Sequence, residues 1–120
     1  MHPWKARAVL IYGPHRPAQW CLDNGEEALI PCGDSEDSQT RAEQLAETLN
    51  LGYAARARAN GSSDNLVAVA ARKIYATCQD IEILSLATFS NGSPKSWGPL
   101  SEKITELRDQ AIEMQNALVR

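Results

Sequence analysis

The chain has 120 residues, of which 43% are hydrophobic and 22% charged, and its formal net charge is −3. This composition excludes a disordered chain, a collagen and a repeat array, and the length predicts one domain over residues 1–120. The longest uncharged run near the N-terminus, Ala8 to His15, is too short to span a bilayer, and there is no signal-peptide pattern. We therefore expect a cytoplasmic protein that does not associate with a membrane.

The chain begins with a predicted strand. Residues 7–12 are a short apolar run with β-branched and aromatic members, which is typical of a buried strand. Residues 14–17 begin and end with proline, which cannot donate to a sheet ladder. They are therefore expected to form a connection.

A β-hairpin is predicted next. An Asn-Gly pair at residues 24–25 lies between the apolar segments 18–23 and 26–31, which favours a two-residue type I′ turn. This turn places Trp20 opposite Leu29, and both then lie on the apolar face of the hairpin together with Leu22.

The hairpin register also bears on the cysteines. It offsets Cys21 from Cys32 by about four residues, on the order of 13 Å at 3.3 Å per residue. A disulfide needs Cα atoms within about 7 Å, so both thiols are predicted to be free. Cys78 makes the number of cysteines odd, which fits a reducing cytoplasm.

Helical periodicity dominates the rest of the chain. The first helix is predicted from an N-cap at Ser38 or Thr40 to Leu49, with Gly52 as its stop. Residues 53–59 are compatible with an exposed strand or with a helix. The expected fold class is α+β: a small N-terminal antiparallel sheet, a hairpin plus one strand, packed against about three helices.

Two further helices follow. One is predicted from Asp64, with Ser62 or Ser63 as its N-cap, to about Gln79. Residues 80–89 fit a strand or an extension of this helix, and we favour a helix to about Thr88. The last helix is predicted from an N-cap at Ser101 to about Leu118. Its narrow apolar stripe suits packing on the preceding helix, which we favour, or a dimer contact.

No motif indicates a reaction. The histidines and cysteines lack the spacing that holds zinc, and no glycine-rich phosphate loop is present. His15 is the only internal histidine, and its position between two prolines predicts an exposed turn. We therefore expect no metal, no cofactor and no enzymatic activity, with a cryptic enzyme that uses His15 or a free cysteine as the alternative.

Acidic side chains are concentrated in one segment. Residues 23–47 carry eight acidic residues and one basic residue. These charges either neutralise other parts of the fold and face solvent, or contact a basic partner, where charge mainly sets association rate and specificity. The candidate partner-binding residues are Asp23, Glu26, Glu27, Asp34, Glu36 and Asp37.

Basic residues define the alternative function. Arg56, Arg58, Arg72 and Lys73 lie near two tyrosines, a combination that can bind phosphates and stack bases. Four charges are few, and the acidic segment would repel nucleic acid, so direct nucleic-acid binding is not the favoured interpretation. A small nucleic-acid-binding regulator is kept as the second hypothesis.

The tryptophans are a separate question. Trp4 lies near the chain end, and Trp97 lies in a segment rich in proline, glycine and serine. Exposed tryptophans often anchor interfaces, whereas the plainer interpretation is that each closes one edge of the core.

The N-terminal hairpin followed by the Ala/Glu/Leu helix at residues 41–50 resembles small proteins of bacteriophages and other mobile elements. The resemblance covers residues 18–80 and implies a non-catalytic binder. Some such proteins, including anti-CRISPR proteins, inhibit host defence complexes. The favoured hypothesis is therefore an inhibitor, monomeric or homodimeric, that occludes a basic, nucleic-acid-binding surface of a host protein or complex.

Overall fold

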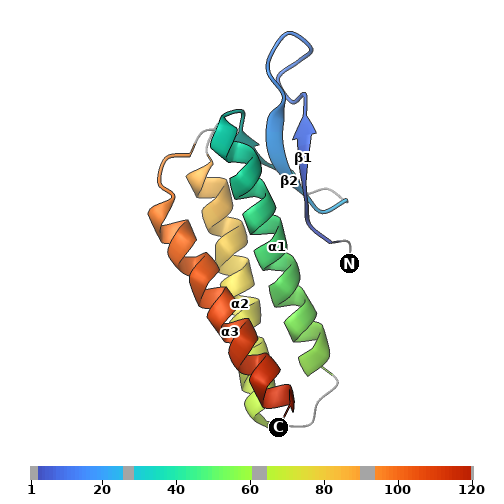
Figure 1. The fold of residues 1–120 in the computed structure, drawn as a ribbon, viewed down its shortest axis with the longest axis vertical. Helices are drawn as coiled ribbons and strands as arrows, with labels where there is room; N and C mark the ends of the chain where they lie inside the picture. Colours follow the sequence, from blue (N-terminus) through green and yellow to red (C-terminus); the bar gives the residue numbers. More distant parts are fainter. Residues whose placement is uncertain (1–2, 26–28, 61–64, 90–93, 120) are drawn as a thin grey trace.

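The computed structural model describes residues 3–25, 29–60, 65–89 and 94–119 and confirms the α+β fold class. Three strands precede three helices: β1 (Lys5–Val9), β2 (Gln19–Asp23), β3 (Leu29–Gly33), α1 (Glu36–Ala59), α2 (Asn65–Thr88) and α3 (Gly98–Val119). The helices lie side by side in an elongated bundle, and the sheet covers one end of α1 (Figure 1). The molecule measures 54 × 27 × 19 Å, so its sheet end and its opposite end are widely separated.

The sheet is antiparallel in the order β1-β2-β3, but the predicted hairpin register is wrong. Leu22 pairs with Ile30, and residues 24–28 connect the strands in place of a two-residue turn. The predicted register would have placed Glu27 opposite Leu22 on the face that packs against α1. A shift by three residues puts Ile30 there and moves Leu29 to the outer face, so core burial determines the register.

Asp23 helps to start this longer connection. Its carboxylate accepts a hydrogen bond from the backbone N–H of Gly25 at 2.8 Å, and Gly25 has a φ of 79°. A positive φ costs glycine little, which explains its place in the turn. Residues 26–28, which a two-residue turn would place opposite Asp23, Leu22 and Cys21, lie outside the described residues.

The prediction of a buried strand over residues 7–12 is also wrong. β1 covers Lys5–Val9 and is an edge strand, and it is not fully buried. Leu10, Ile11 and Tyr12 follow it as an exposed segment. In this region Trp4 belongs to the core and Ala6 packs against it; the two lie on the same face because side chains alternate along a strand.

Cys21 and Cys32 are free, but not because of a long offset along the hairpin. Cys21 pairs with Pro31, next to Cys32, and an irregularity in the ladder lies between Trp20 and Cys21. Cys32 belongs to the core cluster and Cys21 does not. The two thiols therefore lie on opposite faces of the sheet, as strand alternation requires.

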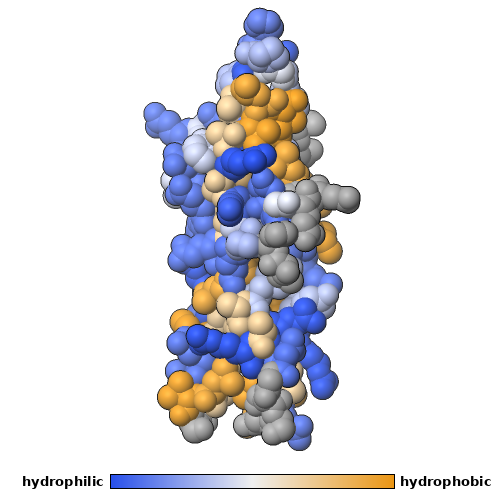
Figure 2. All heavy atoms as spheres, turned by 90° about the vertical axis from the view of Figure 1, so that its right-hand side faces the viewer, coloured by the Kyte–Doolittle hydropathy of each residue, from blue (hydrophilic) through white to orange (hydrophobic). Residues whose placement is uncertain are grey.

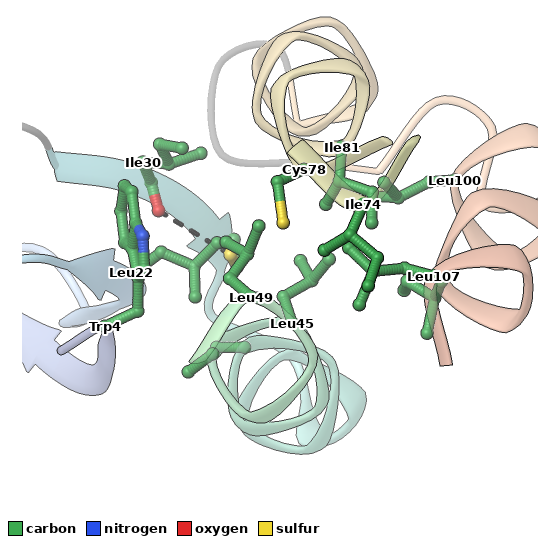
Figure 3. Packing of buried hydrophobic residues seen from close by; sticks show 14 of the residues in the cluster. Trp4, Leu22, Ile30, Leu45, Leu49, Ile74, Cys78, Ile81, Leu100 and Leu107 are labelled. Carbon is green, nitrogen blue, oxygen red and sulfur yellow. Dashed lines mark hydrogen bonds between the residues drawn. The ribbon is translucent and has the colours of Figure 1, made fainter. Parts of the chain in front are cut away.

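The core runs from the sheet through α1 to the other two helices (Figure 3). Trp4, Leu22 and Ile30 approach α1 from the strands, and Leu45 and Leu49 occupy the centre. On the far side the core is completed by side chains of α2 and α3, namely Ile74, Cys78, Ile81, Leu100 and Leu107. α1 is thus the shared layer between the sheet and the helix pair.

The chain end near Trp4 is fixed to α1 by two hydrogen bonds. The Trp4 N–H donates to Asn50 Oδ1 at 2.8 Å, and Asn50 Nδ2 donates to the Trp4 carbonyl at 2.9 Å. The Asn50 amide therefore satisfies both backbone groups of Trp4, as a neighbouring strand would. Trp4 is buried and closes an edge of the core, in line with the plainer interpretation.

Gly52 does not end α1, contrary to prediction, and residues 53–59 continue the helix. A Cβ added at Gly52 would lie 2.5 Å from Cys78 Sγ and 3.0 Å from Leu107 Cδ1. Glycine costs a helix about 1 kcal/mol relative to alanine, so its place here has a packing reason. It allows α1 to approach α2 and α3 closely.

The helix starts differ from the predictions, and the helix interiors agree with them. α1 begins after an N-cap at Ser35, whose N–H donates to Ser38 Oγ at 3.1 Å, and not at Ser38 or Thr40. α3 begins at Gly98, so the predicted N-cap Ser101 lies inside it. The predicted N-caps Ser62 and Ser63 lie outside the described residues.

The extension of α2 to Thr88 is confirmed. The apolar stripe of α3 is buried at Ile104, Leu107, Ala111 and Met114, and α3 packs on α2. The narrow stripe therefore serves the preferred role of an intramolecular helix contact.

We predict that Gly52→Ala lowers the free energy of unfolding by about 1–2 kcal/mol. Overpacking costs about 1–3 kcal/mol, and a contact of 2.5 Å with Cys78 Sγ puts this site in the upper part of that range. The better helix propensity of alanine returns only about 1 kcal/mol. Urea denaturation measures the change.

Gly98→Ala is the matched control, because its added methyl group would meet nothing within 4 Å. The double variant Gly52→Ala/Cys78→Ala should lose less unfolding free energy than the two single variants lose together, since removing Sγ relieves the contact. Strict additivity would contradict the close approach as the reason for Gly52.

Candidate binding surfaces

The nucleophile candidates are poorly placed for catalysis. Burial is the main reason that the pKa of Cys32 and of Cys78 is raised to about 12, and burial also raises the pKa of Cys21. A thiolate, not a thiol, is the nucleophile, so these cysteines are in their unreactive form near neutral pH. His15 is exposed in the connection between β1 and β2, as predicted, whereas the three cysteines are buried.

A partly buried polar contact between α1 and α2 was not identified from the sequence. The Tyr53 hydroxyl donates a hydrogen bond of 2.5 Å to Glu82 Oε1. Burial and then this carboxylate raise the pKa of Tyr53 above its usual range. The two residues are 29 positions apart, so no local pattern reveals the pair, and its role is to join the two helices.

Metal binding finds no support in the ranges that the structure describes: they contain no group of three or more histidine, cysteine, aspartate or glutamate side chains that could hold a metal ion.

The most unusual surface lies at the sheet end. Leu10, Ile11 and Tyr12 are 57%, 37% and 48% exposed. They occupy the start of the connection from β1 to β2, which projects beyond the helices (Figure 1). Figure 2 shows hydrophobic side chains gathered close to the tip of the molecule. A run of three exposed apolar residues disfavours solubility unless it has a function.

The predicted acidic residues separate into three groups. Asp23 forms an ion pair with Arg7 at 3.3 Å and is largely buried. Asp34, Glu36 and Asp37 are exposed at the start of α1, and Asp37 lies 4.0 Å from Arg41. Glu26 and Glu27 lie outside the described residues.

The start of α1 is at the sheet end, where the connection from β1 to β2 also projects (Figure 1). The exposed acidic group Asp34, Glu36 and Asp37 therefore shares one end of the molecule with the apolar run. Part of this acidity has a structural reason, because carboxylates in the first turn stabilise a helix by about 0.3–1 kcal/mol each.

Trp97 does not act as an exposed anchor. It is half-buried, with its ring centroid 6.0 Å from that of Phe89 and 5.5 Å from the guanidinium carbon of Arg41. It closes the core beside the start of α3.

The four basic residues of the second hypothesis lie at the opposite end of the bundle, in three different grooves. Arg56 and Arg72 line one groove between α1 and α2. Arg58 lines a groove between α1 and α3, and Lys73 lines one between α2 and α3. The structure therefore brings together two of the four and places the other two on different sides.

Comparison of the chain with protein-family models, curated proteins and solved structures found no match. In the segments that the structure describes, no helix is both long and apolar enough to cross a membrane.

We predict that the protein loses stability as pH rises above about 9. The folded state keeps the protons of Cys32 and Cys78 up to a pKa of about 12, whereas the unfolded chain releases them near the ordinary value of 9.0. The folded state then binds more protons, so the free energy of unfolding falls by up to about 1.4 kcal/mol per pH unit for each thiol.

Urea midpoints measured between pH 8 and about 10.5 test this linkage. The Cys32→Ala/Cys78→Ala variant should show a shallower fall. An identical slope in this variant would show that other groups cause the alkaline loss.

Proposed function

We propose that this protein is a non-catalytic protein-binding module whose binding surface is the sheet end. The observation that carries the proposal is the exposed run Leu10, Ile11 and Tyr12 on a connection that projects from the body. Apolar and aromatic side chains at the centre of a contact supply most of the binding energy in protein interfaces.

The acidic group at the start of α1 supports a partner with a basic surface. An apolar centre with a charged rim is the common arrangement of a protein interface. Asp34, Glu36 and Asp37 would supply the negative rim, which increases the association rate and favours a basic partner. Asp23 contributes less, because Arg7 already neutralises it.

The proposed mechanism is occlusion of a host surface. A basic surface that normally holds nucleic acid would accept the acidic rim, and the apolar run would fill a neighbouring hollow. This is the behaviour expected of an inhibitor of a host defence complex from a bacteriophage or other mobile element, which the resemblance of residues 18–80 implies. The 54 Å length of the molecule would extend the blocked area beyond the contact itself.

The second candidate is a small nucleic-acid-binding regulator. Its supporting observation is that Arg56 and Arg72 share a groove with Tyr75. The placement of Arg58 and Lys73 in other grooves disfavours a continuous basic track. Counterion release would make such binding strongly dependent on salt.

We predict that Leu10→Ser/Tyr12→Ser lowers partner capture at least about tenfold, because truncating interface anchors commonly costs more than 1 kcal/mol each. Tagged protein is incubated with a lysate of the source cells, and bound proteins are quantified by mass spectrometry. The free energy of unfolding should change by less than about 0.5 kcal/mol, because both side chains are exposed.

Leu66→Ser is the matched control: Leu66 is 73% exposed and lies on α2 at the opposite end. A protein captured equally by all three forms does not bind at the sheet end. If no captured protein distinguishes the Leu10/Tyr12 variant from the control, the proposal is wrong.

We also predict that reversing Asp34, Glu36 and Asp37 to lysine slows association with the captured partner and weakens its salt dependence. Stopped-flow or surface-plasmon measurements at several salt concentrations provide the rates. Glu43→Lys/Glu47→Lys is the control, since both residues are exposed and acidic but lie further along α1. Equal effects of both variants would assign the attraction to net charge alone.

A further inference from the structure

The groove at the far end of the bundle has the features of a ligand site. It lies between the last turns of α1 and the first turns of α2 and has a volume of about 300 Å³. This is the lower end of the range for small-molecule pockets, about 300–1,000 Å³. Ala59, Ala68 and Ala71 line it, and their short side chains leave the space between the helices open.

The polar groups of this groove are positively charged and partly preorganised. The Arg56 guanidinium carbon lies 3.7 Å from the centroid of the Tyr75 ring. This cation–π contact positions the guanidinium over the ring, and a stacked guanidinium can still donate N–H hydrogen bonds to a ligand. Arg72 and Asn60 line the same groove from α2 and from the end of α1.

Neither Arg56 nor Arg72 forms an ion pair with a carboxylate among the described residues. The part of the lining that the structure describes contains no aspartate or glutamate, and the described ion pairs involve Arg7, Arg41 and Lys103. Tyr53 lies one turn before Arg56 on α1, and its hydroxyl donates a hydrogen bond to Glu82 of α2. Arg56 is half-buried, so its charge is partly desolvated without a described anionic partner.

We propose that this groove binds a small phosphate monoester. Arg56 and Arg72 would donate charge-assisted hydrogen bonds to the phosphate, the interaction for which the planar guanidinium is best suited. The alanines and Tyr75 would contact the organic part. The site lies at the opposite end from the proposed protein-binding surface, so the two proposals can be tested independently.

Isothermal titration calorimetry of the full chain at low ionic strength tests the proposal, with AMP, inorganic phosphate and an oligothymidylate without terminal phosphates as probes. AMP is expected to bind saturably with a stoichiometry of one, and inorganic phosphate more weakly. Arg72→Gln should weaken AMP binding about tenfold or more, and Arg72 is exposed, so this variant should fold normally. Arg56→Lys keeps the charge but loses the planar contact, and it should also weaken binding.

Arg58→Gln is the matched control, because it removes the same charge from α1 outside this groove. It should change AMP affinity less than twofold. The proposal is overturned if neither AMP nor phosphate binds, if Arg58→Gln has the same effect as Arg72→Gln, or if only the oligothymidylate binds, which would favour the nucleic-acid hypothesis.

Discussion

The close approach of α1 to α2 and α3 at Gly52 is the constraint on which the rest of the structure depends. A single added carbon there would collide with Cys78 and press on Leu107, so all three helices meet at one point. α1 is also the helix on which the sheet packs, and its middle turns carry Leu45 and Leu49 into the shared core. The position of the sheet, and with it the projecting connection after β1, therefore follows from how deeply α1 is seated. Glycine is tolerated within the helix because the close packing at this point stabilises the fold by more than the low helix propensity of glycine costs.

The sequence predicts the helices well because their signal is repeated many times. Several turns of apolar periodicity identify α2 and α3, and no single residue decides the outcome. Two of the errors lie where one short local signal carried the interpretation. Gly52 suits a helix end as well as a close contact, and only the presence of Cys78 opposite it distinguishes the two. The Asn-Gly pair at residues 24–25 favours a tight turn locally, yet burial of Leu22 against Ile30 selects a longer connection.

The candidate surfaces were less predictable, for two physical reasons. The sequence shows residues 10–12 as part of an apolar run. Nothing in the local sequence shows that the strand before them is an edge strand or that the connection after it projects past the helices. The sequence identifies the four basic residues as candidates, but it does not show which of them share a groove. Arg56 and Arg72 line one groove because of how α1 and α2 are rotated against each other, and that rotation is set by helix packing rather than by sequence spacing.

The hydrogen bonds between Trp4 and Asn50 have a consequence for synthesis of the chain. They join residues 46 positions apart, so the segment around Trp4 cannot be anchored until α1 has been made. Until then β1 and the apolar residues after it have no scaffold, and an early chain would present them to any neighbour. A slow passage of the ribosome through α1 would prolong the interval in which these residues lack their anchor.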